Sequence, residues 1–307
     1  MANAASTLQT RPRPDWLKPW LRGETWAAFL FILPSLIGFT LFYAVPAVRG
    51  LLISFTDWDL LTPAEPVGLG NYQRLIRDRD FWHALWVTLV YVVINVSTQT
   101  VFGLTIAVFM DRLTRSVLVR GIMILPFLFS NVVVGLIWLW ILDPSLGIAN
   151  ELLKAVGLPR QPFLGSPDQA IATIAGINIW RHMGYMALLF LAGLQSIPKD
   201  VYEAAAIDGA GEVRSFWHIT LPLLRPVLVF VLVTTIIGAF QIFDTIAITT
   251  EGGPIDSTRV IMWHIYEYAF QRFNMGYATT ISMALFVLLI FLTLLQLRWF
   301  RAGESDL

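Results

Sequence analysis

Apolar residues along this chain gather in six long stretches, which shorter polar segments separate. Each stretch has about 20 residues or more, which is the length that a helix needs to cross a hydrocarbon core of about 30 Å. The stretches cover residues 26–48, 84–110, 119–142, 171–195, 226–249 and 276–298. They lack the alternation at every second residue that is typical of a membrane β-barrel. The pattern therefore predicts an all-α integral membrane protein, a bundle of about six transmembrane helices.

The composition agrees with this prediction and excludes several other classes of protein. Of the 307 residues, 56% are hydrophobic and 14% are charged, whereas soluble domains carry roughly 25% charged residues. Lys and Arg together number 21, and so do Asp and Glu, which does not suggest a nucleic-acid-binding protein. The chain has no cysteine, so disulfides, thiol nucleophiles and cysteine-ligated metal sites are excluded.

The distribution of basic residues predicts the orientation of the spans. With the N-terminus inside, more lysines and arginines fall in the inner connections than in the outer ones, as the positive-inside rule expects. We therefore predict a mobile cytoplasmic N-terminal tail over 1–25, a membrane domain over 26–298, and a cytoplasmic C-terminal tail over 299–307. A polar loop at 196–225, between spans four and five, is then cytoplasmic.

This loop carries the local signals of two short helices. Pro198 can begin a helix, and the acidic Asp200 and Glu203 suit its first turns. Three alanines follow Glu203 and favour helix without adding bulk, and Gly209 can end the helix because glycine adopts a left-handed conformation cheaply. From the residues alone, the loop is either a docking element for a partner protein or a plain solvated connector.

The spacing of residues in this loop matches a known signature. The pattern EAA-x3-G-x9-I-x-LP is present without a gap, at Glu203-Ala204-Ala205, Gly209, Ile219 and Leu221-Pro222. It resembles the signature of permease subunits of bacterial binding-protein-dependent ABC importers. Three more places resemble the carbohydrate-uptake, maltose-permease-like branch: GLGNYQRL at 68–75, Phe243-Asp244, and TEGGP at 250–254. The resemblance extends over about residues 26–300.

The resemblance implies a coupling helix that sits in a cleft of a cytoplasmic ATPase subunit. The residues expected to couple to it are Glu203, Ala204, Ala205, Asp208, Gly209, Ala210, Gly211, Ile219, Leu221 and Pro222. Two ATPase subunits, a second permease subunit and an extracytoplasmic sugar-binding protein are the expected partners, in a bacterial inner membrane. The loop at 49–83 is too short for the large insertion of the longest family members, so their docking contacts are not transferred to this chain.

The chain itself lacks the motif of an ATP site. A phosphate-binding P-loop needs a Gly-Lys pair, and the three lysines, Lys18, Lys154 and Lys199, follow leucine or proline. We therefore expect a non-catalytic permease that binds no cofactor, with ATP and Mg²⁺ on the separate ATPase.

Polar residues within three of the spans are candidates for the substrate path. They are Asn95 and Gln99 in span two, Asn178, Arg181, His182 and Tyr185 in span four, and Gln241 and Asp244 in span five. Polar side chains at membrane depth usually face the interior of a bundle, and amides, hydroxyls and aromatic rings suit a polyhydroxylated ligand. The alternative is that they only hold the helices together.

Arg181 and Asp244 are the two charged residues among these candidates. A charge within a span is penalised by roughly 2.5–3.5 kcal/mol, so we hypothesise that the two pair across spans four and five. Such a pair could line the path or only fix the register of the helices. Arg181 would also suit an anion, which keeps a polyol or glycerol-phosphate substrate open beside a sugar.

Two outer segments and one other class of function complete the sequence predictions. Arg74, Arg77 and Arg79 lie in a segment with the pattern of an amphipathic helix at the membrane surface. Aromatic residues in 250–275 suggest interfacial anchors, or contacts with the binding protein.

A stand-alone ion-coupled transporter is the alternative to an importer subunit, although Asp244 is a weak case for an ion-coupling carboxylate.

Overall fold

The structure, a computed structural model, describes residues 23–113 and 116–301. Most of the predicted tails, 1–25 and 299–307, lie outside this range. The chain forms two compact units, Met1–Leu52 and Ile53–Leu307, which we describe separately. The described part is largely helical, as the sequence predicts, and its single sheet consists of two short strands.

The first unit contains one apolar helical stretch. It consists of α1 (Gly23–Phe39), a π-helical turn η3 (Thr40–Ala44) and α2 (Val45–Ile53). Residues Ala28–Ile53 are long and apolar enough to cross a membrane, as expected for the first predicted span.

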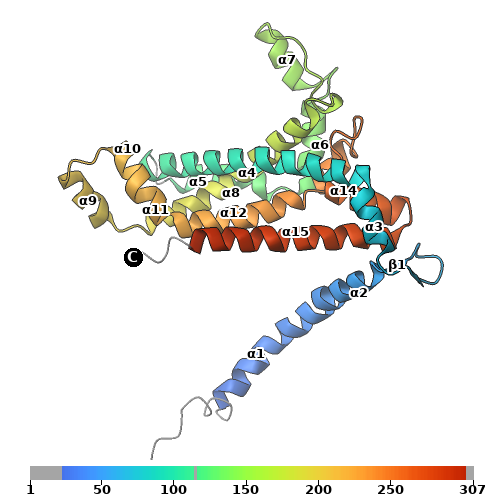
Figure 1. The fold of residues 1–307 in the computed structure, drawn as a ribbon. Coiled ribbons are helices and arrows are strands. Elements are labelled where there is room, and N and C mark those ends of the chain that lie inside the picture. Colours follow the sequence, from blue (N-terminus) through green and yellow to red (C-terminus); the bar gives the residue numbers. More distant parts are fainter. Residues whose placement is uncertain (1–22, 114–115, 302–307) are drawn as a thin grey trace, which may run out of the picture. The chain divides into compact units, whose positions relative to one another are not determined.

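Four long helical segments of the second unit run side by side (Figure 1). They are α4 (Arg79–Leu113), α8 (Ala170–Gln195), α12 (Arg225–Phe240) and α15 (Met275–Arg301). Close contact between α4 and α8 requires a residue without a side chain, since a Cβ on Gly103 would lie 2.8 Å from that of Met186. The buried apolar side chains between these helices include Tyr91, Ile174, Phe240 and Ile281.

The third predicted span, 119–142, is not one continuous helix. It consists of α5 (Val117–Leu128) and α6 (Asn131–Ile141), which meet at an angle of 91°. Phe129 and Ser130 between them have extended backbone conformations, which end the run of helical hydrogen bonds. The fifth predicted span is also interrupted, because three residues separate the end of α12 from the start of α13 (Asp244–Thr249).

The number of spans stays a prediction. By length and composition, four helical stretches of the described chain could cross a membrane, or five if α5 and α6 form one span. Helix α8 occupies the predicted fourth span and has 26 residues. With Asn178, Arg181 and His182 in its middle, α8 is not one of these four stretches.

Short elements connect the long helices at the two ends of the second unit. At one end lie the antiparallel strands β1 (Thr56–Asp57) and β2 (Glu65–Pro66), α3 (Gly70–Arg77), α14 (Ile261–Tyr266) and the π-helix η6 (Glu267–Gln271). The connection after α6 contains α7 (Ile148–Ala155) and the 3₁₀ turn η4 (Phe163–Gly165). At the opposite end lie α9 (Lys199–Ile207), α10 (Glu212–Ser215), η5 (Phe216–Thr220) and α11 (Leu221–Leu223) (Figure 1).

Helix α3 is built into the protein. Its Leu75 is only 7% exposed, and the helix packs on α15. The side-chain amide of Asn71 donates to the carbonyl oxygens of Ser54 and Thr56, at 3.1 and 2.9 Å. Part of the apolar side of this predicted amphipathic helix therefore packs against the rest of the protein, although Ile76 remains exposed.

Candidate functional site

A cavity of about 300 Å³ lies among α4, α6, α8, α12 and α13. Seven of the eight predicted path residues line it: Asn95, Gln99, Asn178, His182, Tyr185, Gln241 and Asp244. They come from three predicted spans that are distant in sequence, and the packing of the helices brings them together. Arg181 is the predicted path residue that does not line the cavity.

Amide and hydroxyl groups provide much of the polar lining. Asn178 donates through Nδ2 to the carbonyl of Ile174 at 3.0 Å and to Oγ1 of Thr245 at 3.3 Å. Asn95 is 3% exposed, and its Nδ2 has no hydrogen-bond partner within the described chain. A buried amide without a partner costs stability, roughly 1–3 kcal/mol. Asn95 thus offers a donor that a bound ligand could satisfy.

Two helix interruptions lie beside the cavity. Asn131 is the first residue of α6, and Asp244 is the first residue of α13. The Nδ2 of Asn131 donates to Oδ2 of Asp244 at 2.6 Å, which joins the two interrupted segments. Our sequence predictions did not include Asn131, although Ser130-Asn131 after Pro126 is a pattern that favours the start of a new helix.

The predicted ion pair between Arg181 and Asp244 is wrong. The described chain contains no ion pair of Arg181 with any acid, and the guanidinium instead donates to the carbonyls of Phe127 and Phe129, at 3.1 and 2.8 Å. These carbonyls lie at the end of α5, where the bend leaves them without helical partners, and the negative end of a helix attracts a cation. The bend in the third span, which our sequence predictions did not include, therefore determines the position of Arg181.

His182 and Tyr185 follow on the same helix. The Nδ1–H of His182 donates to the carbonyl of Asn178 at 2.9 Å, which leaves Nε2 to accept from Arg181 at 2.9 Å. Tyr185 stacks on Phe127, with ring centres 4.4 Å apart. The aromatic and imidazole groups are thus held in place at the wall of the cavity.

The polar loop at 196–225 forms the two short helices that its local signals predict. We call α9, α10 and the turn between them the EAA hairpin. Helix α9 begins after Pro198, and Gly209 follows its end with a left-handed φ of +77°. The amide of Ala210 donates to the carbonyl of Ala205 at 2.9 Å, which closes the end of the helix. Tyr202 of α9 and Thr220 of η5 share a hydrogen bond of 3.0 Å between their hydroxyls. Glycine is needed at 209 because other residues are strained there.

The hairpin presents both the signature residues and apolar side chains to its surroundings. Glu203, Ala204 and Gly209 are exposed, and Ile207 and Val213 are 87% and 74% exposed. Such exposed apolar side chains on a rigid hairpin are typical of a surface that a partner covers. Arg112 in the last turn of α4 forms an ion pair with Glu212 at the start of α10, and so links the hairpin to the long helix. The sequence contained no local signal for this pair.

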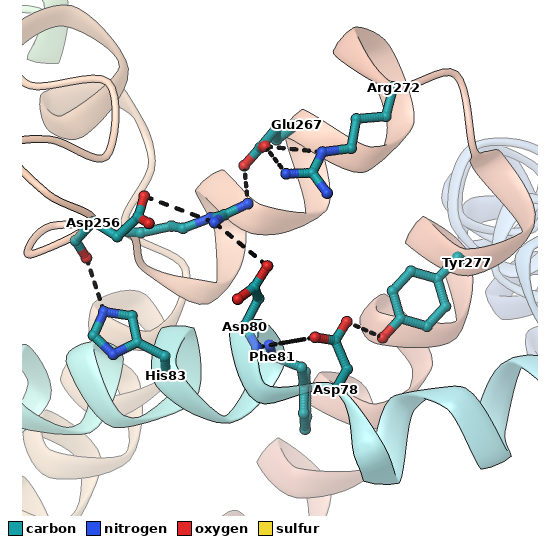
Figure 2. A network of polar contacts seen from close by, with 9 residues as sticks. Asp78, Asp80, Phe81, His83, Asp256, Glu267, Arg272 and Tyr277 are labelled. Carbon is teal, nitrogen blue, oxygen red and sulfur yellow. Dashed lines mark hydrogen bonds and ion pairs between the residues drawn. The ribbon is translucent and has the colours of Figure 1, made fainter.

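At the other end of α4, a network of charges connects α4 to the segment 250–275 (Figure 2). Arg259 is buried and forms ion pairs with Glu267, with Asp256 at 3.7 Å and with Asp80 at 3.9 Å. His83 bonds through Nε2 to the carbonyl of Asp256 at 3.1 Å. These contacts hold the segment 250–275 against the start of α4.

Asp78 belongs to the same network. Its carboxylate accepts from the hydroxyl of Tyr277 at 2.5 Å and from the backbone amides of Asp80 and Phe81 (Figure 2). Partial burial would raise the pKa of Asp78, but these hydrogen bonds outweigh burial and lower its pKa below the ordinary value. In the same region, Trp263 and Tyr268 are buried in the core, whereas Phe270 and Phe273 are exposed, so only the exposed two stay candidates for interfacial anchors.

No metal site accompanies these groups. In residues 23–113 and 116–301, no three His, Asp or Glu side chains are grouped so that they could hold a metal ion.

Known proteins are similar to this chain in both sequence and length. Residues 99–301 match the family described as binding-protein-dependent transport system inner membrane component. The chain is 34% identical over 284 residues to the "Probable ABC transporter permease protein YurN" of Bacillus subtilis, covering 91% of this chain and 97% of that protein. It is 35% identical over 277 residues to the trehalose/maltose transport system permease protein MalF of Thermococcus litoralis, covering 90% and 94%.

The fold is also similar to solved structures. One is a chain of a bacterial alginate ABC transporter in complex with an alginate pentasaccharide-bound periplasmic protein. The two chains superimpose with a TM-score of 0.78 and 25% sequence identity, over 89% of this chain and 93% of the other. The similarity therefore covers nearly the whole chain.

Proposed function

We infer the function of this chain from its family, because it belongs to the binding-protein-dependent transport system inner membrane components, the non-catalytic permeases of ABC importers. In this family the ATPase is a separate subunit. We propose that the chain forms part of the path by which a sugar crosses the bacterial inner membrane. The observation that carries the proposal is the convergence of seven predicted polar residues on one cavity beside two interrupted helices. Interrupted helices beside a cavity are typical of transport sites.

The chemistry of the cavity supports a polyhydroxylated ligand. Amides and hydroxyls can donate to and accept from sugar hydroxyls, and the unpartnered Nδ2 of Asn95 gains a partner when a ligand binds. Polar groups placed in an otherwise apolar pocket usually set the orientation of a ligand. A relative at 35% identity is named as a trehalose/maltose permease, which is consistent with this class.

If the chain is an ABC importer subunit, a glycerol-phosphate is the alternative substrate to a sugar. An anion would need a cationic partner, and the guanidinium of Arg181 is engaged with the carbonyls of Phe127 and Phe129, outside the cavity lining. Asp244, which does line the cavity, would repel an anion. The geometry therefore favours an uncharged sugar or polyol.

The EAA hairpin is the proposed site of coupling to the ATPase. In this proposal, α9 enters a cleft of the ATPase, and both chain termini lie on the same cytoplasmic side. Closure of the two ATPases on ATP would move the hairpin, and rigid rocking of the long helices would open the cavity to alternate sides. The ion pair between Arg112 and Glu212 provides one connection from the hairpin to α4.

The remaining partners follow from the same proposal. A second permease chain would complete the cavity, and two ATPases would hold ATP and Mg²⁺, while this chain binds neither. An extracytoplasmic binding protein would deliver the sugar, as the periplasmic protein in the alginate transporter structure suggests. The large insertion of the longest family members is absent from the loop at 49–83.

Reconstitution distinguishes this proposal from a stand-alone ion-coupled transporter. The importer complex would be co-purified through this chain, inserted into vesicles, and tested for uptake of labelled maltose, trehalose and glycerol 3-phosphate. We expect uptake of a neutral sugar only when ATP, the ATPase subunits and the binding protein are all present. Uptake by this chain alone, driven by an ion gradient, would contradict the proposal.

A further inference from the structure

Three arginines form an exposed basic surface at the end of the second unit opposite the EAA hairpin. Arg74 and Arg77 lie on α3, and Arg79 begins α4; we call these three residues the arginine face. They border an open hollow of about 440 Å³, whose lining also includes Asp78, Asp80 and Tyr268. All three arginines are exposed, and none forms an ion pair with a described residue.

Two acids in the hollow offset part of the charge of the arginine face, but three arginines against two acids leave an excess of positive charge. Asp78 accepts hydrogen bonds from the Tyr277 hydroxyl and from two backbone amides, and Asp80 lies 3.9 Å from the buried Arg259 (Figure 2). Both carboxylates thus serve the internal network. The three guanidinium groups keep their capacity to bind an external carboxylate or another anion, to which Arg presents a planar set of donors.

The face is held in a defined position by aromatic rings. The guanidinium carbon of Arg74 lies 4.1 Å from the ring centre of Tyr277 and 5.6 Å from that of Tyr268. Arg272 also lies against the ring of Tyr268, at 4.5 Å, while it binds Glu267. A side chain that is already ordered loses less entropy on binding, so Arg74 is a good anchor for a partner.

The location of the face indicates which side of the membrane it occupies. Helix α4 has 35 residues and is therefore about 50 Å long. Its last turn carries Arg112, which pairs with Glu212 of the EAA hairpin, and its first residue is Arg79. If the hairpin is cytoplasmic, as the proposed function requires, the arginine face is extracytoplasmic. Clustered arginines on that side are contrary to the positive-inside rule, so they need another explanation.

We propose that the arginine face is a docking surface for an acidic patch on the extracytoplasmic binding protein. The inference rests on the proposed function, which brings that protein to this side. Opposite charges at the rim of an interface mainly accelerate association and make it sensitive to salt. A docking role explains the unpaired arginines, and the fixed connection from this face to α14 and α15 lets docking bear directly on the outer end of the bundle.

The test uses the complete importer in nanodiscs and the purified binding protein that stimulates ATP hydrolysis by the wild-type complex. The rate of association is measured at several salt concentrations for a triple variant, Arg74→Gln, Arg77→Gln and Arg79→Gln. We expect association to slow about tenfold and its dependence on salt to become shallower. A matched control removes three other exposed charges from the same predicted side, by Arg49→Gln, Lys154→Gln and Arg160→Gln, and should retain most of the rate and salt dependence.

A second variant guards against loss of structure. Arg74 packs on aromatic rings, so Arg77→Gln with Arg79→Gln leaves that contact intact and should still slow association several-fold. Wild-type rates and salt dependence in both variants would overturn the proposal. It would also be overturned if the variants lost only bound anionic phospholipid, with association unchanged, since the face would then bind lipid headgroups. If no binding protein stimulates the wild-type complex, the proposed function itself fails.

Discussion

The side-chain amide of Asn131 donates a hydrogen bond of 2.6 Å to the carboxylate of Asp244. The two residues are the first of α6 and α13, so the bond joins two helices at the points where each resumes after an interruption. Both residues line the cavity. A movement of α6 against α13 during transport would change this bond, so its loss can be tested by substitution.

We predict that Asn131→Ala and Asp244→Ala each reduce sugar uptake, and that the double variant is little worse than either single one. The physical reason is that both changes remove the same hydrogen bond, so their effects are not additive. Uptake by reconstituted complexes of equal subunit content measures this. Fully additive losses would show that the two residues act separately.

A related prediction concerns Arg181. Exchanging Arg181 and Asp244 should not restore the uptake that each single reversal abolishes, because the guanidinium binds the carbonyls of Phe127 and Phe129 and not the carboxylate. An acid at position 181 would face those carbonyls and be repelled. Recovery of uptake in the exchanged variant would contradict the observed geometry.

The turn of the EAA hairpin should tolerate a side chain at Gly211 but not at Gly209. A Cβ added at either residue would meet no atom within 4 Å, but Gly209 has a φ of +77°, whereas Gly211 has a φ of −71°. A left-handed conformation costs an alanine about 1–2 kcal/mol. We expect Gly209→Ala to lower uptake, Gly209→Trp to abolish it, and Gly211→Ala to retain it.

Glu203 lies on the exposed face of the same hairpin. We expect Glu203→Lys to abolish uptake while the permease still assembles, because the reversed charge would face the ATPase. Subunit content after purification and ATP hydrolysis stimulated by the binding protein are the measurements. Normal uptake in Glu203→Lys and Gly209→Trp would remove the coupling role of the hairpin.

Two glycines of α8 offer a matched pair for stability. A Cβ on Gly184 would lie 1.8 Å from the carbonyl oxygen of Met123 on α5, whereas a Cβ on Gly176 would meet nothing within 4 Å. Gly184→Ala must push α5 away, and overpacking of this kind typically costs about 1–3 kcal/mol. We expect its midpoint of thermal unfolding to fall, and that of Gly176→Ala to stay unchanged, in the same detergent.

His264 should make stability depend on pH. Its ring is fully buried, and neither nitrogen has a hydrogen-bond partner in the described chain. Burial, with a smaller effect of the nearby positive charge of Arg259, lowers the pKa of His264 from its ordinary 6.5 to about 4. Between these values the unfolded chain binds a proton that the folded chain does not, so stability falls as the pH drops.

The measurement is thermal unfolding of wild type and His264→Phe from pH 7 to pH 4. The contribution of His264 is constant above pH 6.5 and decreases by roughly 3 kcal/mol towards pH 4, as about 1.4 kcal/mol per pKa unit implies. The variant should lose less stability than wild type over this interval. Equal losses would show that the imidazole is not the responsible group.

Much of this protein follows from local sequence. The long apolar stretches require helices in a membrane, since backbone groups in lipid must bond within their own helix. The EAA hairpin is equally local: Pro198 precedes its first helix and Gly209 follows it, as their backbone preferences predict. Period and spacing also selected seven of the residues that line the cavity, because polar groups in a span face the interior.

Tertiary structure decided what depends on contacts between distant segments. The bend of 91° after α5 exposes carbonyls that hold Arg181, so in the described chain Arg181 binds these carbonyls and forms no direct ion pair with Asp244. Likewise, the pairs of Arg259 with Glu267 and of Arg112 with Glu212 join elements through space, with no periodic or motif signal. Sequence by itself determined where most of the helical stretches lie and which polar residues they contain. Packing decided the partner of each charge, because a charge at low dielectric takes whichever opposing group the assembled helices place within reach.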